Sequence, residues 1–159
     1  MKPKENNKWE MPEDAENTIG LSRTEPSVEF ALYNSVRAGD LEAVRANCAR
    51  NPFLELNGAG TLSKDPVQNI KYHHVIAAAL IARLCIDAGM EKEQAYGLSD
   101  FYIRKLDSLQ TAEAVAELHD RMVLDYAERM YRRTHEHTSR PVKMCIDYIY
   151  EHIRERITV

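Results

Sequence analysis

The sequence has few residues that interrupt helices and few that cross-link chains. Its 159 residues include only six glycines, six prolines and three cysteines. Gly and Pro stand at the boundaries of helical patterns, and no segment alternates apolar and polar residues as a half-buried strand does. The cysteines Cys48, Cys85 and Cys145 are widely spaced and odd in number. We therefore expect buried free thiols in a reducing compartment rather than a disulfide framework.

Long hydrophobic runs are also missing. The longest apolar run, from Val75 to Leu84, is interrupted by Arg83 and is far shorter than a membrane span. Residues 1–10 are polar, so we expect no signal peptide. These features predict a cytoplasmic protein with no membrane partner.

The charge balance is mildly acidic. The formal net charge is −4 and 29% of the residues are charged. A domain that binds nucleic acid is usually basic, so charge alone disfavours that class. The 44% of apolar residues suffice for the core of one ordinary domain.

Apolar residues recur at intervals of three and four, which predicts an all-α fold: a single helical bundle of about five to seven helices with a C-terminal helix after a hinge. We expect four segments along the chain. They are a flexible tail over 1–24, a helical domain over 25–133, a hinge over 134–140 and a last helix over 141–159.

Helix boundaries follow from capping residues. Gly39 and Asp40 predict a tight turn between two antiparallel helices, and Asp65-Pro66 is the strongest helix start in the chain. The helix that begins there should stop at Gly89. We expect a long helix from Thr111 to about residue 133. Between Gly89 and Thr111 we expect two helices. The first is short, covers 91–96 and ends at the glycine at 97, and the second begins with an N-cap at residue 99.

Several stretches carry a resemblance to a known family. They are NIKYHHVIAAALIAR at 69–83, GME at 89–91, AYGLSDFYIRK at 95–105, LH at 118–119 and MVLDY at 122–126. They resemble the helical region upstream of the DNA-binding domain in AraC-family transcription regulators of Gram-positive bacteria. The stretch CIDYIYEHIRERIT at 145–158 looks like the first helix of the family's DNA-binding domain.

The resemblance implies a regulatory module rather than an enzyme. The family reads DNA through helix-turn-helix units, and this chain ends after the first helix of that domain, so we expect DNA contact only through a C-terminal domain missing here. The implied function is a sensor and dimerisation module, homodimeric, with an unknown small-molecule or protein effector. The alternative is a stand-alone helical interaction module, for example a truncated regulator that forms mixed dimers.

A small effector pocket would draw on polar side chains in the matched region. The candidates are Tyr72, His73, Arg83, Tyr96, Tyr102 and Tyr126. The alternative for the tyrosines is that each ring packs inward and each hydroxyl meets water. For Arg83, which lies in the most apolar helix, a structural ion pair with Asp87 or Asp100 is favoured over an anion site.

No catalytic, cofactor or metal site is expected. No phosphate loop, nucleophile elbow or metalloprotease motif occurs in the sequence. The adjacent His73 and His74 point about 100° apart on a helix and cannot easily share one ion, even with His119. We expect these histidines to be partly buried and hydrogen-bonded.

The last helix should carry a dimer or interdomain surface. Its apolar stripe consists of Val142, Cys145, Ile146, Ile149, Ile153 and Ile157. Exposed aliphatic side chains favour association because burying each contributes roughly 1.5 to 3 kcal/mol. A basic cluster precedes and overlaps this helix, at Arg129, Arg132, Arg133, Arg140 and Lys143. It could contact phosphates in an intact regulator, but an ordinary charged hinge is favoured.

Overall fold

A computed structural model describes residues 25–55 and 59–136, together with positions 142, 144, 145, 148, 149 and 152. Within these ranges there are six α-helices, one short 3-10 helix and no strand. The prediction of an all-α bundle of about five to seven helices is confirmed. The expected tail over 1–24 lies outside the described residues. The elements are α1 (Pro26–Ala38), α2 (Leu41–Cys48), α3 (Pro52–Glu55), α4 (Pro66–Asp87), α5 (Lys92–Lys105), η3 (Leu106–Ser108) and α6 (Ala112–Glu136).

A glycine turn joins α1 to α2. Gly39 has φ +71°, a left-handed conformation that glycine adopts without strain. A Cβ at Gly39 would lie 2.6 Å from the backbone nitrogen of Tyr131, so α6 also packs directly against this turn. Asp40 then accepts a hydrogen bond from the amide of Ala43 at 3.0 Å. The predicted hairpin and its N-cap are therefore confirmed.

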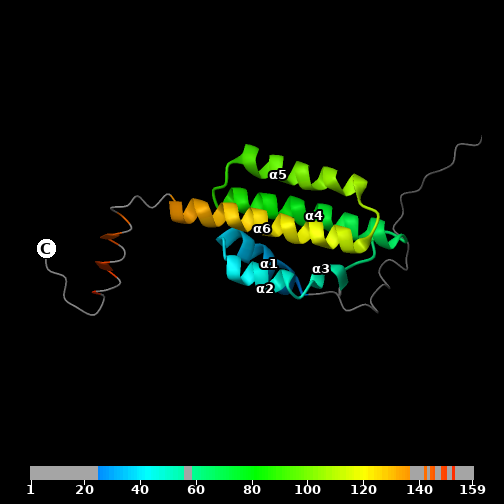
Figure 1. Cartoon of the computed structure of the whole chain (residues 1–159), viewed down its shortest axis with the longest axis horizontal. Coiled ribbons are helices and arrows are strands. Elements are labelled where there is room, and N and C mark those ends of the chain that lie inside the picture. The colour runs from blue at the N-terminus through cyan, green and yellow to red at the C-terminus, as the bar shows by residue number, and fades with distance from the viewer. Residues whose placement is uncertain are drawn as a thin grey trace, which may run out of the picture.

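Helix α4 is the centre of the bundle and contacts α1, α5 and α6 (Figure 1). Asp65 caps it by accepting a hydrogen bond from the amide of Gln68 at 2.9 Å, and Gly89 ends it at φ +96°, both as predicted. Its buried residues are Ile70, His74, Ala77, Ala78, Ile81, Ala82 and Cys85. The small alanines let the neighbouring helices approach closely.

Helix α5 corrects one expected boundary. It runs without a break from Lys92 to Lys105, through Gly97. Gly97 is exposed, and a glycine inside a helix costs only about 1 kcal/mol relative to alanine. Burial of Ala95, Leu98 and Tyr102 on the inner face continues across the glycine and outweighs that cost.

Helix α6 also differs from expectation, because it extends to Glu136. Residues 134–136 of the expected hinge are therefore helical, and residues 137–140 lie outside the described part. The hydroxyl of Thr111 accepts a hydrogen bond from the amide of Ala114 at 3.2 Å, as a predicted N-cap should. Beyond α6, Cys145 is exposed, whereas a buried thiol was expected.

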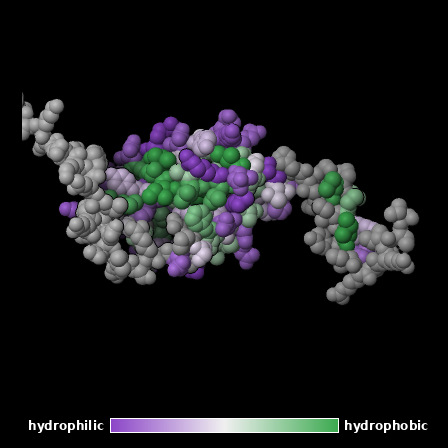
Figure 2. All heavy atoms as spheres, turned by 180° about the vertical axis from the view of Figure 1, so that it is seen from behind, coloured by the Kyte–Doolittle hydropathy of each residue, from purple (hydrophilic) through white to green (hydrophobic). Residues whose placement is uncertain are grey.

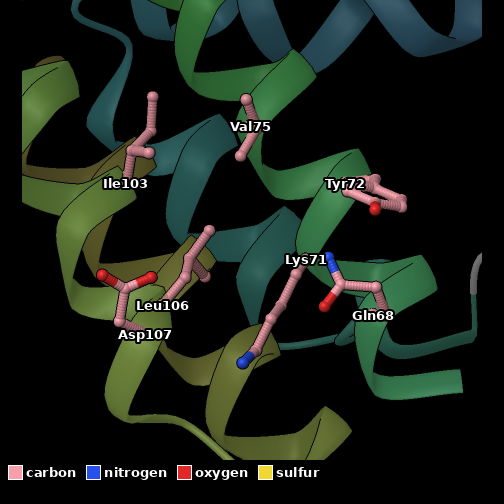
Figure 3. A pocket seen from close by; sticks show the side chains of 7 residues that line it. All are labelled: Gln68, Lys71, Tyr72, Val75, Ile103, Leu106 and Asp107. Atoms are coloured by element: carbon pink, nitrogen blue, oxygen red, sulfur yellow. The ribbon is translucent and has the colours of Figure 1, made fainter. Parts of the chain in front are cut away.

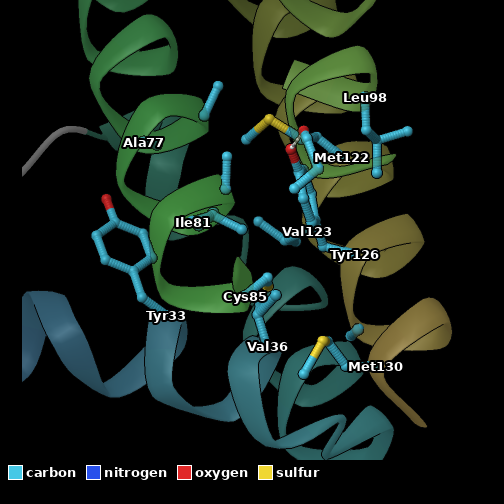
Figure 4. Packing of buried hydrophobic residues seen from close by; sticks show 14 of the residues in the cluster. Tyr33, Val36, Ala77, Ile81, Cys85, Leu98, Met122, Val123, Tyr126 and Met130 are labelled. Atoms are coloured by element: carbon cyan, nitrogen blue, oxygen red, sulfur yellow. Dashed lines mark hydrogen bonds between the residues drawn. The ribbon is translucent and has the colours of Figure 1, made fainter. Parts of the chain in front are cut away.

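Helices α4 and α6 lie side by side and run in the same direction. His74 lies near His119 at the end where both helices begin, and Arg133 reaches the carbonyl of Ala88 where both finish. Helix α5 returns antiparallel to both (Figure 1). Most of the core lies along the interface of α4 and α6 and includes Val36, Ile81, Met122 and Tyr126 (Figure 4). A smaller cluster lies at the end of the bundle where α4 and α6 begin and consists of Ile70, Leu106, Val115 and Ala116.

Candidate functional site

The hydroxyls of the two buried candidate tyrosines already have partners. The hydroxyl of Tyr126 donates to the carbonyl of Ala95 at 2.6 Å, deep in the core. The hydroxyl of Tyr102 lies 3.2 Å from the carboxylate of Asp125 and 3.3 Å from the carbonyl of Arg121. Burial, and next the charge of Asp125, raises the pKa of Tyr102 to about 12. Both side chains therefore join α5 and α6 instead of presenting hydroxyls to a ligand.

The other candidate pocket residues lie at separate places on the surface. Tyr72 and Tyr96 are half-exposed, and ring Nε2 of His73 lies 2.7 Å from the carbonyl of Gly60. Tyr72 and Arg83 are both on α4, where eleven residues span about 16 Å. Of the predicted pocket residues, the structure brings Arg83 to Tyr96 on the surface and places Tyr102 and Tyr126 in the same core cluster, so the six do not form one pocket.

Arg83 corrects a prediction. It is exposed, and its guanidinium donates to the carbonyl of Ala79 at 2.9 Å and lies 6.0 Å from the centre of the Tyr96 ring. The expected partner Asp87 instead pairs with Arg37 at 2.8 Å. Because the side chain reaches water, it needs no buried carboxylate, and within the described ranges none pairs with it.

A shallow groove lies between α4 and η3 (Figure 3). Its volume is about 280 Å³, slightly below the range usual for small-molecule sites. The groove is lined by Gln68, Lys71, Tyr72, Val75, Ile103, Leu106 and Asp107. Lys71 and Asp107 place opposite charges beside an apolar floor. Tyr72 is the one predicted pocket residue among them, so the groove is not the predicted effector pocket.

Apolar side chains also gather on the outer surface of the bundle. Figure 2 shows them across the middle of one face, with polar side chains around them. On α4 and α5 the half-exposed large side chains are Tyr72, Ile76, Tyr96 and Phe101. Tyr72 and Ile76 are one turn apart on α4, and Tyr72 also lines the groove, so this part of the surface is better suited to contact with a protein than to enclosing a small molecule.

The most unusual polar groups are two buried histidines. His74 on α4 is 0% exposed and His119 on α6 is 2% exposed. Both ring nitrogens of His74 and Nδ1 of His119 have no hydrogen-bond partner among the described residues. The expectation of partly buried, hydrogen-bonded histidines therefore holds for His73 and is wrong for the other two.

Burial determines the ionisation of this pair. Desolvation, and next the neighbouring His119, lowers the pKa of His74 to about 3. Desolvation also lowers the pKa of His119, although Asp120 acts in the opposite direction. The Asp120 carboxylate lies 3.7 Å from Nδ1 of His119, beyond hydrogen-bond distance. Both imidazoles are therefore neutral at pH 7.

The two thiols of the bundle are poor nucleophiles. Burial raises the pKa of Cys85 to about 12, and burial followed by the charge of Asp120 raises the pKa of Cys48 to about 12. A nucleophile or a metal ligand needs the thiolate. In the described part of the chain, no group of three or more His, Cys, Asp or Glu side chains is arranged to hold a metal ion, and no helix has the length and apolar character to cross a bilayer.

The basic residues at the end of α6 have partners within the chain. Arg129 pairs with Asp125 at 2.8 Å, Arg132 with Glu128 at 3.5 Å, and Arg133 donates to the carbonyl of Ala88 at 2.9 Å. Arg133 thereby satisfies an open carbonyl at the end of α4. For these three residues the contacts favour an ordinary charged helix end over a phosphate-binding cluster, and Arg140 and Lys143 of the predicted cluster lie outside the described residues.

Phe53 is the residue that sequence reasoning missed. It lies on α3, a helix absent from the predicted helix boundaries, and packs against the smaller core cluster. The signal was present, because Asn51-Pro52 resembles the Asp65-Pro66 helix start. No family model, curated protein or solved structure matches this chain, so the site must be judged on its own chemistry.

Proposed function

We propose that this chain is the sensor and dimerisation module of an AraC-type transcription regulator of the cytoplasm, with no catalytic step of its own. The observation that carries the proposal is the exposure of apolar side chains beyond α6. Val142 is 50% exposed, Met144 65%, Tyr148 54% and Ile149 51%. Soluble proteins rarely expose several large apolar side chains close together, so we expect a partner to cover these side chains.

The course of α6 adds to this argument. Helix α6 carries Val115 of the smaller core cluster near its start and ends at Glu136, so one continuous helix runs the length of the bundle toward the part of the chain that holds the exposed side chains. A module that passes a dimer contact or a signal along the chain needs such a connection. The resemblance of residues 69–126 to AraC-family regulators is the support for assigning the module to that family in this proposal.

The partner that we propose for the exposed segment is a second copy of the chain. Cyclic dimers are the commonest assemblies of soluble proteins, and regulators of this class bind paired half-sites. Ile149 and Val142 belong to the stripe expected to form the dimer. Cys145 is exposed between them, whereas Ile146, Ile153 and Ile157 lie outside the described residues.

A dimerisation reporter tests the proposal. The chain is fused to a DNA-binding domain that represses only as a dimer, and light scattering measures the mass of the purified chain at tens of micromolar. We expect repression and a dimer for the native sequence, and loss of both for the double variant Val142→Glu, Ile149→Glu. Leu62→Glu, which alters an exposed apolar side chain outside this segment, is the matched control.

The results separate the two functions under consideration. A monomer that does not repress would refute the dimerisation module. It would favour the stand-alone interaction module, for which the half-exposed Tyr72 and Ile76 and the adjoining groove are the specific support. The isolated chain should not bind duplex DNA specifically in either case, because it carries a net charge of −4 and phosphate attraction supplies most non-specific affinity.

A further inference from the structure

The buried histidine pair lies against a single aromatic side chain. The rings of Phe53 and His119 are stacked, with centroids 3.7 Å apart and planes 5° apart. His74 meets both rings edge-on, at 6.3 Å from Phe53 and 6.0 Å from His119. Helices α3, α4 and α6 are thus joined by one aromatic cluster at the end of the bundle where α4 and α6 begin.

This cluster requires neutral imidazoles. The nitrogens of His74 find no partner among the described residues, and an added proton would place a positive charge there without a counter-charge. Burying an unpaired charge is far more costly than burying an unpaired neutral group. The closed arrangement is therefore stable only while both rings remain unprotonated.

Few charged groups act on the pair. From α6, Asp120 approaches His119 at 3.7 Å, and from α2 the Cys48 thiol acts on Asp120. From α3 the group that faces the pair is the uncharged ring of Phe53. On α4, His73 is the sequence neighbour of His74, but its ring bonds the carbonyl of Gly60 instead. Asp120 offers partial compensation to His119, and His74 has none.

The element that covers the pair is a weak one. Helix α3 has only four residues, Pro52–Glu55, and follows Asn51, whose φ is +48° in the left-handed region. A single helical turn has little stability of its own and depends on the contacts of its side chains. Local opening of such an element needs much less free energy than global unfolding.

We propose that His74, His119 and Phe53 form a proton-operated latch, in which protonation of either imidazole releases α3 and opens this end of the bundle while the rest stays folded. This inference is independent of the proposed function. Once α3 has opened, the imidazoles should titrate near pH 6.5, their ordinary value. The opening constant should then rise about tenfold per pH unit below pH 6.5 for one imidazole, and up to about a hundredfold for both.

Hydrogen exchange on the full chain tests the latch. Amide exchange is followed by mass spectrometry at pH 7.5, 6.5 and 5.5, with labelling times scaled for intrinsic exchange. We expect peptides over 51–55 to lose protection at least about fivefold between pH 6.5 and 5.5, because one imidazole titrates in this window. Peptides over α5 and the second half of α6 should show no such change.

Three variants assign the effect. His74→Leu should reduce the pH dependence, because leucine cannot take up a proton. His135→Gln, an exposed histidine at the other end of α6, should leave it unchanged. His73→Gln tests the competing group, because His73 contacts the 59–65 segment through Gly60. If His73→Gln abolishes the pH dependence and His74→Leu does not, the latch is wrong.

A titration of the native chain keeps the proposal testable even if His74→Leu does not fold. In proton NMR, the ring resonances of His74 and His119 should not titrate near pH 6.5 while 51–55 remains protected. Titration of both near pH 6.5 with α3 still protected would overturn the latch. Stoichiometric Zn²⁺ binding that requires His74 and protects 51–55 at pH 5.5 would also overturn it, since the pair would then be a metal site.

Discussion

The two ends of the α4–α6 interface differ in whether their polar groups are hydrogen-bonded. Where the helices finish, the hydroxyl of Tyr126 bonds the carbonyl of Ala95 at 2.6 Å and the guanidinium of Arg133 bonds the carbonyl of Ala88 at 2.9 Å. Where they begin, His74 and His119 are as buried as Tyr126, but three of their nitrogens have no described partner. The bundle thus has one end where these polar groups are hydrogen-bonded, the satisfied end, and one end where the buried imidazoles lack described partners at three nitrogens, the unsatisfied end.

This difference predicts that the two ends of the bundle respond differently to pH. Satisfied polar groups hold one geometry and give the first end no reason to change with pH. Unsatisfied imidazoles cost about 1 to 3 kcal/mol per group and make the second end sensitive to protons. Apolar side chains of the same shape in place of His74 and His119 would remove this cost.

The largest effect is expected at the satisfied end, from Gly39→Ala. The variant forces a left-handed alanine and places its Cβ 2.6 Å from the backbone of Tyr131. We expect it to lower the free energy of unfolding by about 2 to 5 kcal/mol, as the sum of the backbone strain and the overpacking. Urea denaturation at pH 7.5 measures this.

The matched control is Gly97→Ala. Gly97 is exposed within α5, and its Cβ would meet nothing within 4 Å. This variant should raise stability by about 0.5 to 1 kcal/mol, because alanine favours the helix. A loss of only about 1 to 2 kcal/mol for Gly39→Ala would correspond to the backbone strain alone and would contradict the close packing of α6 against the α1–α2 turn.

The second effect is a loss of stability at low pH, caused by the buried histidines at the unsatisfied end. The pKa of His74 falls from an ordinary value near 6.5 to about 3 on folding, so the unfolded chain takes up this proton first. Stability is therefore complete above pH 6.5 and declines as the pH falls toward 3. Between pH 7.5 and 5.0 we expect a loss of about 2 kcal/mol from His74, with His119 acting in the same direction. Denaturation curves at both pH values, for the native chain and His74→Leu, measure it, and equal losses would contradict the assignment.

Local chemistry explains which parts of the fold the sequence could predict. Gly39-Asp40, Asp65-Pro66, Gly89 and Thr111 each act on the backbone within a few residues, so their roles are readable without a structure. The prediction that a helix ends at Gly97 was wrong, because a glycine ends a helix only where no buried face continues across it. In α5 that face does continue, and the long-range packing decided the outcome.

The candidate site could not be read in the same way. The partners of His74 are His119 and Phe53, which are separated from it in sequence by 45 and 21 residues and are brought to it only by the parallel packing of α4 and α6. For the tyrosines, the sequence left two alternatives, a ligand pocket or inward rings with hydroxyls in water, and periodicity cannot say whether a hydroxyl meets a ligand, water or a backbone carbonyl. Tyr126 meets a carbonyl.

A smaller effect is expected for Tyr126→Phe, which removes the hydroxyl from the satisfied end. The carbonyl of Ala95 loses this bond in a fully buried position, so we expect a loss of about 1 to 2 kcal/mol. Tyr102→Phe should cost less, because the Tyr102 hydroxyl is only partly buried and its two bonds are long. Denaturation curves at pH 7.5 compare them. A larger cost for Tyr102→Phe would show that the Asp125 contact, not the core bond, secures α5.

The smallest effect concerns the surface over the satisfied end, where Asp87 has two candidate partners. Asp87 pairs with Arg37 at 2.8 Å, and Arg83 instead donates to the carbonyl of Ala79. A double-mutant cycle of Arg37→Met with Asp87→Asn should therefore give a coupling of about 0.2 to 1 kcal/mol, reduced by added salt as for any exposed pair. The same cycle with Arg83→Met should give none within error. Arg83→Ala and Arg83→Met should both stay within about 0.5 kcal/mol of the native chain, because neither leaves a buried carboxylate unpaired. A coupling for Arg83 that matches or exceeds the coupling for Arg37 would restore the ion pair that the helical spacing suggested.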